Sequence, residues 1–275
     1  MKGKTSKKRW NSIKKALLLL LFFTVILTVV NFKTIIHIYH AYMLFSPEHL
    51  ASNFRSLDQR FPSRLVSADE HTFVFTYADS ELPDFYVHNG ETRSTLQFIE
   101  DTQTTGLIVT DGSTVFYEQY FNGNLEHSPA ILWSVTKSVV SALVGIAVGE
   151  GSIQDINDPV TAYLPSFQGS GYEGVTIKHL LQMSSGVRFT EKYNDPSSDF
   201  NRLAPRSIGL GGPMEGVLLA LPKEHPPGTY NRYSSADTQV LGMVLQAAVG
   251  MDLTQYIQTR LWQPAGMEYD AHWLT

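Results

Sequence analysis

Residues 133–151 read WSVTKSVVSALVGIAVGEG, the most informative segment of the sequence for the fold. Its apolar residues recur every three or four positions, which is the period of a helix: Val135, Val139, Leu143 and Ile146. Gly149 or Gly151 can end that helix. At its start, Ser134 and Lys137 form an S-x-x-K pattern. Because residues three apart share one face of a helix, the pattern predicts that the Lys137 amine lies beside the Ser134 hydroxyl.

This pairing is typical of nucleophilic catalysis. A serine hydroxyl becomes a strong nucleophile when a neighbouring base takes its proton. A lysine amine can be that base in its neutral form, which apolar neighbours such as Leu132 and Trp133 favour. N–H groups at a helix start also face a developing oxyanion. Taken alone, the pattern has an ordinary alternative, in which Ser134 is an N-cap and Lys137 is solvated.

A second pattern lies about 100 residues further along the chain. Residues 233–235 read YSS, a Y-x-S pattern in which Tyr233 is a candidate proton-handling group. The pattern follows PPGT at 226–229, a predicted tight turn, and precedes a predicted helix over 238–250. The alternative for Tyr233 is a half-buried loop tyrosine. Residues 120–122 (YFN) form a rival Y-x-N pattern inside a predicted hairpin.

The remaining elements indicate an α+β body. Short strands are predicted over 71–78 and 84–89, and a hairpin over 105–121 with Asp111-Gly112 at its turn. Helices dominate after residue 134, including one over 253–261. Strands followed by helices predict an antiparallel sheet flanked by helices, with a helical region inserted after the sheet has begun.

Composition excludes several classes of function. The chain has 275 residues, 43% hydrophobic and 17% charged, and no cysteine, so it contains no thiol nucleophile and no disulfide framework. It also lacks H-E-x-x-H, P-loop, G-x-G-x-x-G and G-x-S-x-G motifs, so no metal and no cofactor are predicted. His179 is interpreted as structural. Net charge is −5, and the acidic body argues against nucleic acid as a partner.

The N-terminus predicts a membrane anchor. Residues 1–15 hold seven basic residues and no acid, and residues 16–38 form a mostly apolar run whose single charge is Lys33. As one helix, that run is roughly 34 Å long, enough to cross a bilayer. We therefore expect a single-pass signal anchor with the body outside the cytoplasm. A cleaved signal peptide is the alternative. Residues 39–70 are then a connector, and residues 71–275 are the main domain.

Several phrases, read together, resemble one enzyme family. Residues 133–165, 175–189, 226–250 and 261–268 resemble, in order, four elements of class C β-lactamase-like, penicillin-recognising serine hydrolases. Within that family, RFTEKYNDPSSD at 188–199 most resembles the 6-aminohexanoate-dimer hydrolase branch. The resemblance implies a β-lactamase/transpeptidase-like fold, with an antiparallel sheet, an all-α region and the serine between them.

The resemblance also implies roles for individual residues. Ser134 is then the acylated nucleophile, Lys137 the general base and Tyr233 the partner that passes a proton to the leaving group. Tyr193 and Ser235 are then expected to contact substrate. The family's third element, a K/H-[ST]-G-like segment, has no match between Tyr233 and Thr275. We therefore expect the chain to lack the family's C-terminal strands and helix, and its turnover to be weakened.

Two function hypotheses follow. The first is a serine hydrolase that cleaves an ester, a linear amide, a D-peptide or a β-lactam through an acyl-enzyme. The second is a non-catalytic, membrane-anchored ligand-binding module on the same fold. Labelling of Ser134 by a serine-reactive probe distinguishes the two.

Overall fold

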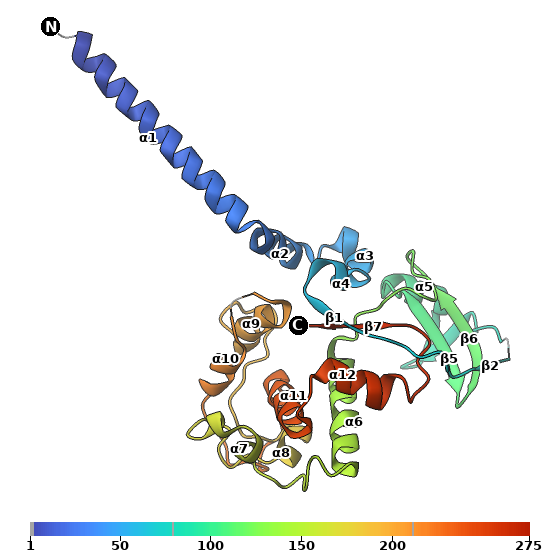
Figure 1. The fold of residues 1–275 in the computed structure, drawn as a ribbon. Helices are drawn as coiled ribbons and strands as arrows, with labels where there is room; N and C mark the ends of the chain where they lie inside the picture. Colours follow the sequence, from blue (N-terminus) through green and yellow to red (C-terminus); the bar gives the residue numbers. More distant parts are fainter. Residues whose placement is uncertain (1–2, 79, 211) are drawn as a thin grey trace. The chain divides into compact units, whose positions relative to one another are not determined.

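The computed structural model describes residues 3–78, 80–210 and 212–275. The chain divides into two compact units, Met1–Pro47 and Glu48–Thr275. Figure 1 shows the elements of both units. The second unit contains every candidate residue of the site.

The N-terminal unit contains two helices where the sequence predicted one. Helix α1 spans Gly3–Val30 and α2 spans Phe32–Met43, and the apolar stretches Leu17–Val30 and Phe32–Met43 meet at a bend of 68°. Asn31 lies at the bend, and its side-chain amide and backbone N–H both donate to the Leu27 carbonyl oxygen. A side chain that competes for a helix carbonyl is a common cause of a kink.

The bend changes the predicted membrane segment. Within the described residues, no single helix is both long enough and apolar enough to cross a membrane. The apolar parts of α1 and α2 reach that length and hydropathy only when they are taken together across the bend. The expectation of one continuous helix over 16–38 is therefore wrong. The sequence pattern could not show this, because Asn31 is uncharged and leaves the run apolar on average.

Among its described residues, the second unit has three sheets of short strands. The order β2-β6-β5 joins Thr76–Tyr77, Thr114–Tyr120 and Gly106–Asp111, with β5 and β6 antiparallel. The turn between them has Gly112 at φ 56°, which confirms the predicted hairpin. β3 (Phe85–His88) pairs with β4 (Glu91–Ser94), close to the predicted strand over 84–89. The strand predicted over 71–78 is shorter, because only β2 pairs in it.

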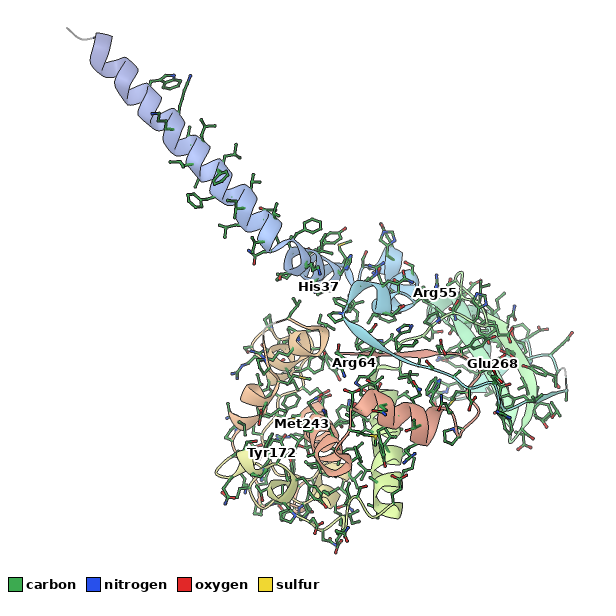
Figure 2. All side chains as sticks on the ribbon, in the orientation of Figure 1. His37, Arg55, Arg64, Tyr172, Met243 and Glu268 are labelled. Atoms are coloured by element: carbon green, nitrogen blue, oxygen red, sulfur yellow. The ribbon has the colours of Figure 1, made fainter. Side chains whose placement is uncertain are left out.

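The third sheet joins the two ends of this unit. Strand β1 (Ser63–Val66) pairs antiparallel with β7 (Ala271–Leu274), the last element of the chain. Figure 2 labels Arg64 on β1, which forms an ion pair with Asp252. The compact unit therefore begins before the expected boundary at residue 71, inside the stretch expected to be a connector.

The other regular elements described in this unit are helices. The two longest are α6 (Thr136–Gly149) and α11 (Ser235–Val249), which lie against each other. The shorter α-helices are α3 (Leu50–Phe54), α4 (Leu57–Arg60), α5 (Thr95–Asp101), α7 (Val160–Tyr163), α8 (Ile177–Leu181), α9 (Asp199–Leu203), α10 (Glu215–Leu219) and α12 (Leu253–Ile257). Helical turns of the 3-10 type lie at Pro47–His49, where the two units meet in sequence, and at Trp133–Val135, Pro165–Phe167 and Ala204–Ile208, and a π-helical turn lies at Gln258–Trp262.

The core lies between these helices. Its fully buried side chains come mainly from α6, α11 and the loops around α8, and include Leu143, Val144, Phe167, Ile177, Val244 and Leu245. Burying each such side chain contributes about 1.5–3 kcal/mol. Val66 of β1 joins the same cluster. The predicted α+β class is confirmed, and this shared core fixes the ends of α6 and α11 that carry the candidate site.

Candidate active site

Ser134 lies on a strained turn just ahead of α6. The turn Trp133–Val135 is 3-10, and α6 begins at Thr136, so Ser134 precedes the α-helix on which the sequence placed it. Trp133 has φ 44°, a conformation that a bulky residue rarely adopts, and its ring packs edge-on against Phe54 with centroids 5.3 Å apart. Such strain costs about 1–3 kcal/mol and gathers at functional sites.

Lys137 lies one turn after Ser134, as the S-x-x-K spacing predicts. Its Nζ donates a hydrogen bond to Ser134 Oγ at 3.2 Å. The side chain is half-buried, and Leu132 and Trp133 are 44% and 45% exposed. Leu132 and Trp133, which were expected to shield the Lys137 amine from water, are therefore themselves partly exposed.

Tyr233 also contacts Ser134. Its hydroxyl donates to Ser134 Oγ at 2.7 Å, and its ring centroid lies 4.9 Å from Lys137 Nζ. Backbone and side-chain bonds fix the segment before it: Arg232 N–H donates to the Met183 carbonyl, and the Asn231 amide donates to that of Gln182. Three side chains from two distant parts of the sequence thus meet at one oxygen atom.

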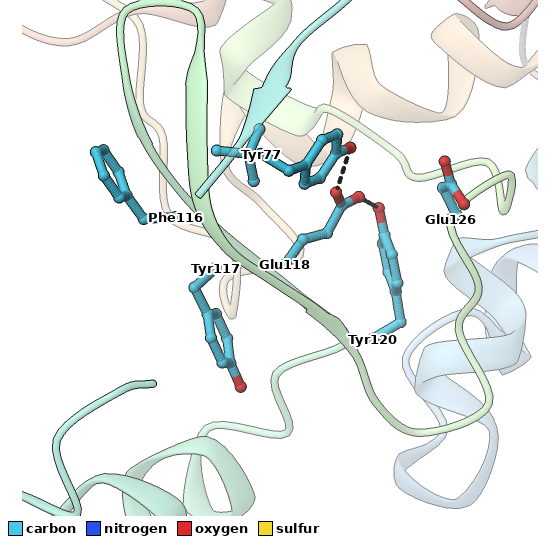
Figure 3. Close-up of a pocket in the computed structure, with 7 residues that line it drawn as sticks. Tyr77, Phe116, Tyr117, Glu118, Tyr120 and Glu126 are labelled. Carbon is cyan, nitrogen blue, oxygen red and sulfur yellow. Dashed lines mark hydrogen bonds between the residues drawn. The ribbon is translucent and has the colours of Figure 1, made fainter. Parts of the chain in front are cut away.

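The rival tyrosine pattern lies elsewhere. Tyr120 is on β6, where its hydroxyl bonds to Glu118, and burial raises its pKa. Figure 3 shows this region, a hollow of about 480 Å³ in which Tyr77 and Tyr120 both point to Glu118. Ser134, Lys137 and Tyr233 do not line it.

Tyr193 and Ser235, expected to contact substrate, meet at a residue that the sequence did not single out. The Tyr193 hydroxyl donates to Glu191 Oε1 at 3.2 Å, and the Ser235 hydroxyl donates to the same oxygen at 2.6 Å. Burial, the Glu191 carboxylate and nearby Tyr233 raise the pKa of Tyr193. Glu191 lies within the stretch RFTEKYNDPSSD at 188–199, but only the folded chain shows which groups its carboxylate binds.

A second carboxylate that the sequence patterns did not predict to be important, that of Asp237, lies in the first turn of α11. Asp237 is buried and accepts hydrogen bonds from the Ser185 hydroxyl at 2.8 Å and the Tyr172 hydroxyl at 3.3 Å. Tyr172, labelled in Figure 2, is fully buried as well. Burial raises the pKa of Asp237 to about 6, against lowering by these hydrogen bonds. The cluster ties α11 to the loop that supports Tyr233.

His179 has a structural role at the start of α8, as the sequence predicts. Its Nδ1 accepts the Thr176 backbone N–H at 3.2 Å, and the Thr176 hydroxyl accepts the N–H of His179, so the two close a capping box on α8. Burial lowers the pKa of His179, with a smaller contribution from Lys178. The described residues contain no group of three His, Cys, Asp or Glu side chains that could hold a metal ion.

Known proteins resemble this chain in sequence and in fold. The chain is 31% identical over 182 residues to the 6-aminohexanoate-dimer hydrolase of Paenarthrobacter ureafaciens, a match covering 64% of the chain and 46% of that protein. It is 26% identical over 125 residues to a protein of Salmonella typhimurium provisionally named a D-alanyl-D-alanine carboxypeptidase, covering 44% of the chain and 28% of that protein. The chain thus spans less than half the length of these curated relatives.

A solved structure extends the comparison to the fold. A Bacillus anthracis protein, provisionally named a 6-aminohexanoate-dimer hydrolase, superposes with a TM-score of 0.76 at 23% identity, over 85% of this chain and 63% of that one. This likeness confirms the β-lactamase/transpeptidase-like α+β fold, and the sequence similarities confirm the resemblance to the 6-aminohexanoate-dimer hydrolase branch. Residues 97–273, well over half of the chain, match the beta-lactamase family, and the chain therefore belongs to that family.

Proposed function

We propose that the chain is a serine hydrolase that cleaves an ester or amide bond through an acyl-enzyme on Ser134. One observation carries the proposal: Lys137 Nζ and the Tyr233 hydroxyl converge on Ser134 Oγ at 3.2 and 2.7 Å. Membership of the beta-lactamase family supports the same chemistry.

The first step is attack by Ser134. In the resting arrangement both neighbours donate to Ser134 Oγ, so one of them must lose a proton before it can accept that of the serine. We assign this role to Lys137 as a neutral amine. Ser134 Oγ then bonds to the substrate carbonyl carbon as its proton passes to Nζ. The oxyanion that forms needs hydrogen-bond donors, and backbone N–H groups near the start of a helix can supply them.

The second step expels the leaving group. Tyr233 touches both the nucleophile oxygen and the lysine, so it is placed to pass a proton from Lys137 to the departing amine or alcohol. Collapse of the tetrahedral intermediate breaks the bond to that group and leaves Ser134 acylated. Water, deprotonated by the same pair, then attacks the acyl carbon. Collapse of that intermediate breaks the bond to Ser134 Oγ, releases the carboxylic acid and returns a proton to the serine.

The substrate we propose is a linear amide or ester. The similarity to 6-aminohexanoate-dimer hydrolases favours this class over a β-lactam or a D-peptide. Hydrolysis of short linear amides and p-nitrophenyl esters, set against labelling by a fluorescent penicillin, distinguishes these classes. Faster acylation by penicillin than by the linear substrates would reverse the assignment.

A fluorophosphonate probe tests the catalytic proposal itself. Wild-type protein should be labelled covalently, and Ser134→Ala should not, because the probe reacts only with an activated serine. Equal labelling of the two would remove Ser134 from the mechanism. A wild-type protein that takes up no label would favour the alternative, a non-catalytic ligand-binding module.

We also propose that the N-terminal segment anchors the protein in the cell membrane, with the body on the extracytoplasmic side. Seven basic residues precede the apolar run, and α1 and α2 together meet the composition and length test for a span. The partners proposed are thus a small ester or amide substrate and the bilayer.

A further inference from the structure

The carboxylate of Glu191 holds the start of the helix that follows Tyr233. Its Oε2 accepts the Ser235 backbone N–H at 2.8 Å, and its Oε1 accepts the Ser235 hydroxyl at 2.6 Å. Ser235 is the first residue of the 15-residue helix α11. A carboxylate at this end also interacts favourably with the helix dipole. Glu191 therefore fixes the backbone two residues beyond Tyr233.

The same carboxylate fixes Tyr193. The Tyr193 hydroxyl donates to Oε1 at 3.2 Å, and its ring packs edge-on against Phe200 with centroids 4.8 Å apart. Asn201 braces the loop further, because its side-chain amide donates to three backbone carbonyls between residues 192 and 195. Tyr193 is 60% exposed, so this bracing holds an exposed ring in one place.

We infer that Glu191 is a positioning residue, which sets the Tyr233 hydroxyl at Ser134 and holds the Tyr193 ring beside the start of α11. The inference rests on the proposed function. Glu191 acts on the nucleophile through Ser235 and Tyr193, with which it forms its hydrogen bonds. A displacement of about 1 Å at a reacting group can cost about a hundredfold in rate. Its loss should therefore slow acylation more than it weakens binding.

The first test is the substitution Glu191→Gln in the full chain. The carboxamide has nearly the same size, but it has one acceptor oxygen for three donors, and its NH₂ group faces hydroxyl and amide donors. We expect fluorophosphonate labelling to slow by roughly 10- to 100-fold, with its concentration dependence little changed. The matched control is Glu173→Gln, since Glu173 also accepts one side-chain amide and one backbone N–H, from Gln168 and Gly169. That control should label at the wild-type rate.

Hydrogen–deuterium exchange supplies a readout that does not depend on catalysis. The Ser235 amide should exchange faster in Glu191→Gln than in wild type, because its acceptor is weakened. Thermal unfolding should show both variants folded. If Glu191→Gln does not fold, the double variant Tyr193→Phe/Ser235→Ala removes the two hydroxyl bonds, leaves the carboxylate in place and should reproduce the slow labelling.

The outcomes separate the two proposals. Wild-type labelling rates in folded Glu191→Gln, or in the double variant, would overturn the positioning role. Unchanged exchange at Ser235 would overturn it as well. Absence of labelling in wild type itself would count against the proposed function, and the exchange measurement then still decides whether Glu191 fixes the start of α11.

Discussion

At Ser134 the chemistry depends on which neighbour can accept a proton. Lys137 and Tyr233 both donate to the same oxygen, and the Lys137 amine also lies over the Tyr233 ring. The two residues also differ in their distance from Ser134 along the sequence. Lys137 lies one turn away on the same segment, whereas Tyr233 is 99 residues away and is brought to Ser134 by the tertiary fold.

Substitution of Lys137 separates a base from a mere positive charge. Lys137→Arg keeps the charge but cannot accept a proton, because a guanidinium stays protonated. We expect its acylation rate to fall nearly as far as that of Lys137→Ala, by several orders of magnitude. Tyr233→Phe should lose less, since the lysine still activates Ser134. The measurement is acylation rate against pH for the three variants. Wild-type acylation by Lys137→Arg would mean that the base lies elsewhere.

The buried Asp237 makes stability depend on pH. Its folded pKa of about 6 lies above the usual value of 3.8, so folding favours its protonated form. The stability that it contributes is therefore complete below about pH 3.8 and is lost as pH rises through about 6. That difference corresponds to about 3 kcal/mol at most.

Asp237→Asn should remove this pH dependence, because an amide does not ionise. We expect the free energy of unfolding of wild type, relative to Asp237→Asn, to fall between pH 4 and pH 7 and then to level off. Urea unfolding of both proteins across that range measures the difference. A difference that is constant or rises with pH would show that the Asp237 carboxylate is not held at a raised pKa.

At the scale of elements, the loop at residues 182–186 supports the segment that carries Tyr233. The Gly186 carbonyl accepts the N–H groups of Glu224 and His225, and the Ser184 carbonyl accepts that of Gly228. Gly186 has φ 73°, and a Cβ there would lie 2.1 Å from the His225 carbonyl oxygen. Only a glycine at position 186 lets its backbone and that of His225 approach each other this closely.

Gly186→Ala should therefore destabilise the fold by more than about 3 kcal/mol, because it adds a backbone clash to an unfavourable φ. Gly174→Ala is the matched control, since Gly174 has φ 77° and no atom within 4 Å of a Cβ. It should lose only about 1–2 kcal/mol. Urea unfolding compares the two. Equal losses would mean that the close approach at Gly186 relaxes easily.

Local elements followed from the sequence better than distant pairings did. The hairpin at Asp111-Gly112 and the face shared by Ser134 and Lys137 are set within a few residues, so pattern and spacing predicted both. The roles of Glu191 and Asp237 depend on bonds to residues 44 and 52 positions away, which no local pattern encodes. The strained Trp133 was missed for a similar reason, because tertiary packing supports its conformation.

At the scale of the molecule, strands from near the two ends of the second unit pair with each other. β1 and β7 pair although about 200 residues separate them, and Val66 of β1 lies in the core beneath. Neither strand has a strong pattern of its own, since each is four residues long. The expected boundary at residue 71 lies after β1, and the pairing of β1 with β7 includes residues 63–66 in the compact unit Glu48–Thr275.

The N-terminal unit gives the last prediction, which concerns topology. A positive charge before an apolar segment keeps that side of a membrane protein in the cytoplasm, and here seven basic residues precede the run. The bend at Asn31 does not remove this bias, because orientation follows flanking charge and not helix continuity. A phosphatase reporter that is active only outside the cytoplasm, fused after residue 70, should therefore be active and should fractionate with membranes.

Replacing the seven basic residues with glutamine in the same fusion is the matched control and should reduce that activity. Reporter activity confined to the cytoplasm would refute the proposed orientation, and activity in a soluble extracytoplasmic fraction would indicate cleavage instead of anchoring.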